Sequence, residues 1–206
     1  CNYYLARLAF LRGAFAEAGA GFSRAVDLDA LRFRAPHQMN DIISGLCKKY
    51  PSAHLVNTHA LFESWSDHGI IGNRLILEHL HPNLLGYALL SDAFYESMKK
   101  AGLISITRDK EMPFGQLLRN MPITSMDSLT AAIKIFNLKK SWPFSEVQVT
   151  DSAEADPTAG GTEEEKLAYA VASRKMSWFD ANKSLYDYYV SHRDMANAKT
   201  VIETLV

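Results

Sequence analysis

Apolar residues recur at three- and four-residue spacing in separate segments of this 206-residue chain, and glycines and prolines lie between those segments. This spacing matches the turn of an α-helix, so each segment is expected to bury one helix face. The sequence therefore predicts a predominantly α fold. The expected helices cover residues 3–10, 15–25, 36–49, 84–101, 124–140, 162–176, 178–190 and 193–205.

Gly13 separates the first two expected helices and suits a tight turn between them. Ala18, Phe22 and Ala25 fall on one face of the second helix, where small side chains permit close packing and an aromatic ring fills the remaining gap. The pattern resembles part of a tetratricopeptide repeat (TPR), so residues 1–30 are predicted to form a TPR-like helical hairpin. An ordinary helical hairpin is the alternative.

A short β component is predicted after the third expected helix. Tyr50, Pro51 and Ser52 break that helix, and the mostly apolar residues 53–58 have the length of a strand. A helix followed by a short buried strand is typical of α/β folds. This region is therefore predicted to have α/β character.

Three helix ends carry recognisable capping residues. Gly102 follows the fourth expected helix and suits a left-handed C-terminal cap. Thr124 with Asp127, and Thr162 with Glu165, have the spacing of a capping box at a helix start.

Residues 150–161 are predicted to be a linker, because they are rich in Asp, Ala, Pro, Thr and Gly and have almost no large apolar side chain. The helices that follow, in residues 162–206, have apolar residues at TPR-like offsets, although Arg193 stands where a TPR turn has glycine. These residues are predicted to form a TPR-like packing or interaction module.

The charge balance and the cysteines exclude several classes of function. Lys and Arg total 22 against 23 Asp and Glu, so no basic field would attract nucleic acid or an anionic membrane. No apolar run approaches the roughly 18 residues of a membrane span, and Cys1 and Cys47 match neither a metal site nor a disulfide framework. We expect no nucleic-acid partner, no membrane span in this chain, no metal and no cofactor. The sequence predicts no compartment.

Glu78 and His81 are the strongest candidates for chemistry. A serine hydrolase needs a histidine that takes the proton of a serine hydroxyl, and a carboxylate that holds the tautomer of that histidine. The two residues lie three apart in a turn that ends at Pro82, whose ring stiffens the backbone. Both side chains can therefore point to the same side.

The surrounding block, residues 77–87, resembles the last sequence block of SGNH (GDSL-type) hydrolases. In that family an acid-x-x-His pair ends the last core strand and precedes the C-terminal helix. The resemblance implies that His81 is the catalytic base and Glu78 its carboxylate, although the commoner acid there is Asp.

The TPR-associated members of the family are the most similar, and the resemblance covers about residues 1–145. It implies that residues 31–149 form the C-terminal part of a three-layer α/β hydrolase domain that follows a TPR-like hairpin. The implied substrate is an acyl ester whose two parts the sequence does not identify.

The nucleophile of that family is not found in this chain. It lies in a Gly-Asp-Ser block near the start of the domain, and the oxyanion-hole Gly and Asn lie in middle blocks; Gly72 and Asn73 imitate the latter only superficially. The first helical segment is already under way at Cys1, which predicts a piece of a longer protein. An upstream part would supply the serine and the oxyanion hole, and this chain alone is expected to be inactive.

Two other interpretations stay open. In the first interpretation, the hydrolase-like block is degenerate, and the TPR-like helices bind a protein partner without catalysis. In the second, His79 and His81 bind zinc with Glu78, although no further ligand cluster lies nearby in the sequence.

Overall fold

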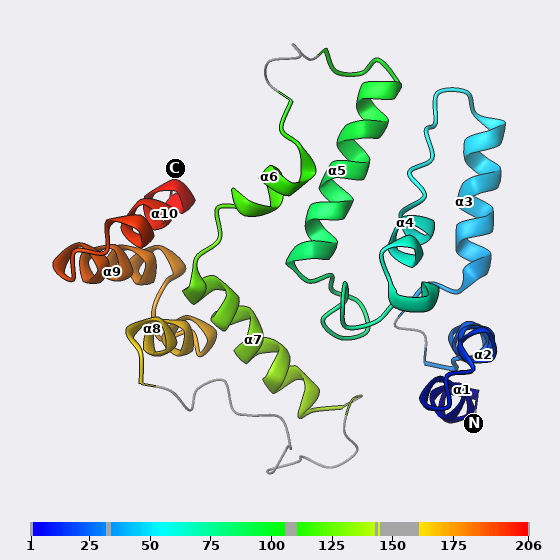
Figure 1. Ribbon diagram of the computed structural model, residues 1–206, viewed down its shortest axis with the longest axis horizontal. Coiled ribbons are helices and arrows are strands. Elements are labelled where there is room, and N and C mark those ends of the chain that lie inside the picture. Colours follow the sequence, from blue (N-terminus) through cyan, green and yellow to red (C-terminus); the bar gives the residue numbers. More distant parts are fainter. Residues whose placement is uncertain (1, 32–33, 106–110, 143, 145–160, 206) are drawn as a thin grey trace. The chain divides into compact units, whose positions relative to one another are not determined.

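The structure is a computed structural model that describes residues 2–31, 34–105, 111–142, 144 and 161–205. Helices dominate these residues, which confirms the prediction of a mainly α fold (Figure 1). The helices are α1 (Asn2–Leu11), α2 (Phe15–Asp27), α3 (His37–Lys49), α4 (Thr58–Ser64), the 3-10 helix η1 (Asp67–Gly69), α5 (Leu84–Lys100), α6 (Phe114–Arg119), α7 (Ser125–Lys139), α8 (Glu163–Ala172), α9 (Trp178–Ser191) and α10 (Met195–Leu205).

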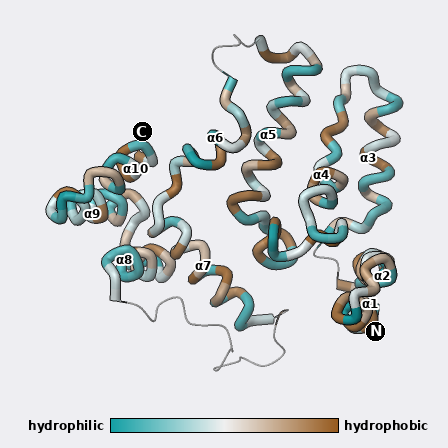
Figure 2. Tube along the Cα trace, in the orientation of Figure 1, coloured by the Kyte–Doolittle hydropathy of each residue, from teal (hydrophilic) through white to brown (hydrophobic). Residues whose placement is uncertain are grey.

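The chain divides into two compact units, Cys1–Arg119 and Asn120–Val206. Hydrophobic and hydrophilic residues alternate along the helices, α5 for example, as amphipathic packing requires (Figure 2). No helix in the described part of the chain is both long enough and apolar enough to cross a membrane.

In the first unit, α1 and α2 form the predicted hairpin. Gly13 lies in the turn with φ +76°, and Ala18 is fully buried. The helices lie close together at Gly21, where an added Cβ would lie 2.8 Å from the Cβ of Ala6. The hairpin and its glycine turn are thus confirmed, and its TPR character stays a prediction.

One type of C-terminal turn ends four of the described helices. The second residue after the helix has positive φ, and the amide that follows it donates a hydrogen bond to the carbonyl five residues earlier, which defines a Schellman motif. The left-handed position is occupied by Gly13, Gly102, Arg174 and Arg193. The amide-to-carbonyl pairs are Ala14 with Ala9, Leu103 with Met98, Lys175 with Ala170, and Asp194 with Tyr189. The predicted cap at Gly102 is therefore confirmed.

The predicted strand at residues 53–58 is not formed. Residues 53–57 are an irregular segment between α3 and α4, and Thr58 already belongs to α4. A strand exists only when its backbone pairs with a neighbour, and no described segment pairs with this one. The β component of the described residues is reduced to an isolated bridge between Ile76 and Pro82.

Helix α3 has the predicted apolar face but does not bury it. None of its residues is buried. The exposed apolar residues of α3 are Met39, Ile42, Ile43 and Leu46.

The second unit packs α7 on α8, α8 on α9 and α9 on α10. It has a continuous apolar core, which consists of Met126, Ile133, Leu167, Ala168, Ala181, Leu185, Tyr189, Ala198 and Val201. Helix α7 belongs to this unit, whereas the sequence interpretation placed it within residues 31–149. Residues 150–160, most of the predicted linker, lie outside the described residues.

Polar side chains also connect the helices of the second unit. Both predicted capping boxes are present, and Asp127 of the first box also accepts a hydrogen bond of 2.7 Å from the indole of Trp178 in α9. Tyr189 donates to Glu164 of α8 at 2.7 Å. Burial raises the pKa of Tyr189 to about 12, so its hydroxyl stays a donor.

Candidate functional site

Glu78 and His81 lie on a tight turn directly before α5. The Ile76–Pro82 bridge closes this turn, and Leu77 donates its amide hydrogen to the carbonyl of His81 at 2.8 Å. Backbone hydrogen bonds thus join its two limbs, which limits the freedom of the residues between them.

The carboxylate of Glu78 is the centre of the turn. Its side chain is fully buried. Its Oε1 accepts from the backbone of His81 at 3.0 Å and pairs with the ring Nδ1 of His81. Its Oε2 accepts from the backbone of Leu80 at 2.7 Å and from that of His79, and the ring Nδ1 of His79 lies 2.7 Å from it.

These hydrogen bonds determine the charge of Glu78. Burial acts to raise the pKa, but the hydrogen bonds from the His81 ring and from the three backbone amides outweigh it and lower the pKa to about 2. Glu78 is therefore a carboxylate at neutral pH.

The ring of His81 is half exposed, at 53% of its side-chain surface. A carboxylate on Nδ1 favours the tautomer with the proton on that nitrogen, which leaves a lone pair on Nε2. This is the arrangement that a general base requires. The structure thus brings together the two residues that the sequence singled out, and their catalytic roles stay predictions.

Asn83 and Gly86 connect the turn to α5, and the sequence interpretation gave them no separate roles. The Asn83 side chain accepts from the amide of Gly86 at 3.0 Å and so caps α5. At Gly86 an added Cβ would lie 2.5 Å from the carbonyl oxygen of Leu75, so only glycine allows this approach. The available signal was an Asn immediately before a helical pattern, with a glycine three residues later.

The hypothesis of a zinc site concerns the same turn, with His79, His81 and Glu78 as the ligands. In the structure, the ring Nδ1 atoms of His79 and His81 both face oxygens of Glu78. Within the described ranges, no group of three or more His, Cys, Asp or Glu side chains is arranged to hold a metal ion.

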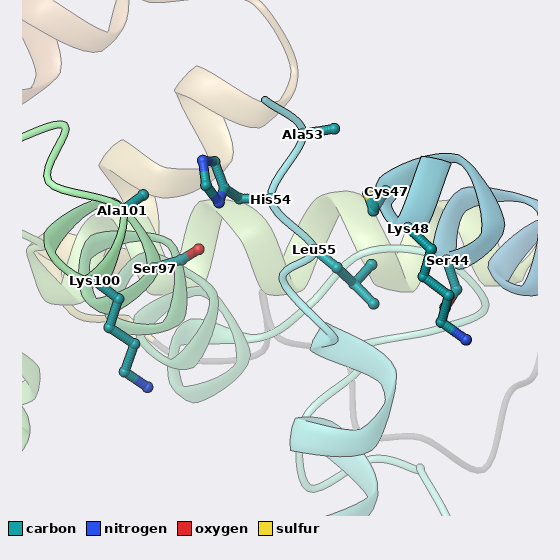
Figure 3. A pocket seen from close by; sticks show the side chains of 9 residues that line it. All are labelled: Ser44, Cys47, Lys48, Ala53, His54, Leu55, Ser97, Lys100 and Ala101. Carbon is teal, nitrogen blue, oxygen red and sulfur yellow. The ribbon is translucent and has the colours of Figure 1, made fainter. Parts of the chain in front are cut away.

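A separate hollow of about 360 Å³ lies between α3, the irregular segment 53–57 and the end of α5 (Figure 3). Neither Glu78 nor His81 lines it. It is lined by Ser44, Cys47, Lys48, Ala53, His54, Leu55, Ser97, Lys100 and Ala101.

Comparisons of the chain with models of known protein families, with curated proteins and with solved structures find no match.

Proposed function

We propose that His81 and Glu78 are the general base and the orienting acid of an SGNH-type hydrolase that cleaves acyl esters. The observation that carries this proposal is the exposed imidazole whose Nδ1 is engaged by a buried, ionised carboxylate. A solvated surface pair would not need a carboxylate that accepts four hydrogen bonds within one turn.

The proposed reaction follows from this geometry. Nε2 of His81 takes the proton of a serine hydroxyl while the serine oxygen attacks the ester carbonyl, and the resulting imidazolium returns that proton to the leaving alcohol. Water then cleaves the acyl-serine through the same base. Glu78 keeps its charge throughout and stabilises the imidazolium. The serine and the oxyanion hole are proposed to lie outside these 206 residues.

Two features of the first unit support the proposed α/β context. The apolar face of α3 is exposed, as on a helix that covers a sheet contributed from elsewhere. In the irregular segment, His54 points toward Ser97 of α5 and Leu55 points toward α3, which is the alternation of a strand between two helices (Figure 3). We propose that strands outside this chain complete the layer.

The test compares histidine variants in a longer polypeptide. In this polypeptide, the segment that carries the proposed Gly-Asp-Ser serine precedes the 206 residues. With a chromogenic short-chain ester, His81→Ala should lower kcat by a factor of about 10³ or more, because the base is removed. His54→Ala, at an exposed histidine of the same unit, should leave kcat unchanged. Equal turnover by His81→Ala and wild type would reject His81 as the base.

The second candidate function is binding of a protein partner through the second unit. It is favoured by Phe179, a large apolar side chain that is 58% exposed near the start of α9. Under this hypothesis no variant hydrolyses the ester, and Phe179→Ser weakens partner binding while Glu78→Gln does not. A fragment for this test should begin at Asn120, because α7 contributes Met126 and Ile133 to the core.

A further inference from the structure

The turn of residues 77–81 has two limbs: the first limb leads into these residues, and the second limb leaves them. Asn83 lies where the two limbs and α5 meet. Its Oδ1 accepts from the amide of Gly86 at 3.0 Å. Its Nδ2 donates to the carbonyl of Arg74 at 2.8 Å and to that of Asn73 at 3.3 Å. One side chain therefore fastens the first limb of the turn to the helix that follows the second limb.

The backbone reinforces this connection. The amide of Asn83 donates to the carbonyl of Leu75 at 2.8 Å. The absent side chain of Gly86 lets α5 lie against the same carbonyl and against Pro82, whose Cβ would be 2.8 Å from an added Cβ. Leu75 itself is completely buried.

The first limb is also connected to η1 by an ion pair. Arg74 pairs with Asp67 of η1 at 2.8 Å, but both side chains are exposed, and exposed ion pairs contribute little. The amide group of Asn83 holds the same limb through two hydrogen bonds, to the carbonyls of Arg74 and Asn73.

We propose that Asn83 is a positioning residue for His81. The Glu78–His81 hydrogen bond spans residues that lie between the two limbs, so its geometry depends on how the limbs are fixed relative to each other. The cap on α5 needs only the Oδ1 of Asn83, whereas its Nδ2 adds two hydrogen bonds to the backbone hydrogen bonds that join the limbs. The catalytic meaning of this role rests on the proposed function, and the structural role does not.

Three variants separate the two tasks of this side chain. Asn83→Ser and Asn83→Asp both retain an oxygen that can cap α5, and both lose the two hydrogen bonds that Nδ2 donates. Asn73→Ala is the matched control, because Asn73 takes part in this network through its backbone carbonyl.

The readout is the tautomer of His81 in the 206-residue chain, observed by long-range ¹H–¹⁵N correlation of the ring at about pH 8, at which ordinary imidazoles are neutral. Wild type and Asn73→Ala should show the proton on Nδ1. Asn83→Ser and Asn83→Asp should lose that signature, while the amides of α5 keep their protection from hydrogen exchange.

Retention of the wild-type tautomer in both Asn83 variants would overturn the proposal and reduce Asn83 to a helix cap. If one variant fails to fold, the other decides. No ester is involved in this measurement, so an absence of turnover would overturn the proposed function alone. Unchanged tautomers would overturn the positioning role alone.

Discussion

The two units of this chain are stabilised in different ways. In the second unit, four helices share a core of buried apolar side chains that extends from α7 to α10. In the first unit, the cluster beside the candidate site has Phe62, Leu75 and Leu89 as its buried members, and no residue of α3 is buried. The turn that presents His81 depends instead on hydrogen bonds and on one close glycine contact. Packing thus determines the second unit, and local polar geometry determines the candidate site.

The largest test of this difference compares one apolar helix residue from each unit. Leu185 in α9 is completely buried, so Leu185→Ala should destabilise the second unit by about 2–5 kcal/mol through lost burial and a cavity. Ile42 in α3 is 50% exposed, so Ile42→Ala should change stability by less than about 1 kcal/mol. Hydrogen exchange of each unit in the intact chain measures both effects. Equal losses would show that α3 is packed as firmly as α9.

The helices and several of their ends could be predicted from the sequence. Helical spacing, the capping box at Thr124 and Thr162, and glycine at positions 13 and 102 all act within a few residues, so the chain alone specifies them. The turn geometry of Glu78 and His81 was predicted for the same reason, because the interaction spans only three residues.

The rest depends on contacts that are distant in the sequence. The segment 53–58 has the composition of a strand, but pairing decides whether a strand forms, and no described segment pairs with it. The membership of α7 in the second unit depends on the contacts of Met126 and Ile133 with residues after the predicted linker. The steric requirement at Gly86 depends on the carbonyl of Leu75, which periodicity does not reveal.

A second prediction uses pH to separate polar from apolar stabilisation. The pKa of Glu78 is lowered from 4.5 to about 2, so its ionised form stabilises the turn above about pH 4.5, and this contribution is lost as the pH falls toward 2. The protection factors of the amides around residues 77–83, which correct for the intrinsic pH dependence of exchange, should therefore fall over this range.

Glu78→Gln should lack this pH dependence. Glu17→Gln, at an exposed glutamate of the same unit, should retain it. A wild-type turn that keeps constant protection from pH 5 to pH 2 would contradict a role of the carboxylate charge.

A third prediction compares two helical glycines of the first unit. At Gly86 an added methyl group meets the carbonyl of Leu75 and the ring of Pro82, so Gly86→Ala should destabilise the turn by about 1–3 kcal/mol. At Gly45 in α3 nothing lies within 4 Å, so Gly45→Ala should stabilise its helix by about 0.5–1 kcal/mol. Hydrogen exchange should show a loss of protection in α5 of Gly86→Ala and a gain of protection in α3 of Gly45→Ala. These opposite changes would confirm that close approach, and not helix propensity, determines the residue at position 86.

The smallest predicted effect concerns a type of turn that occurs in both units. Gly13 and Arg193 occupy the same left-handed position of a Schellman motif, with φ +76° and +60°. An arginine there is strained by about 1–2 kcal/mol, and the greater freedom of glycine in the unfolded chain offsets part of the gain. Arg193→Gly should therefore stabilise the α9–α10 hairpin by about 0.5–1 kcal/mol, and Gly13→Ala should destabilise α1–α2 by about 1 kcal/mol. Thermal unfolding and hydrogen exchange of the two hairpins measure the pair. If Arg193→Gly is instead destabilising, the arginine side chain contributes contacts that exceed the backbone strain, and the two turns are alike in geometry but not in what stabilises them.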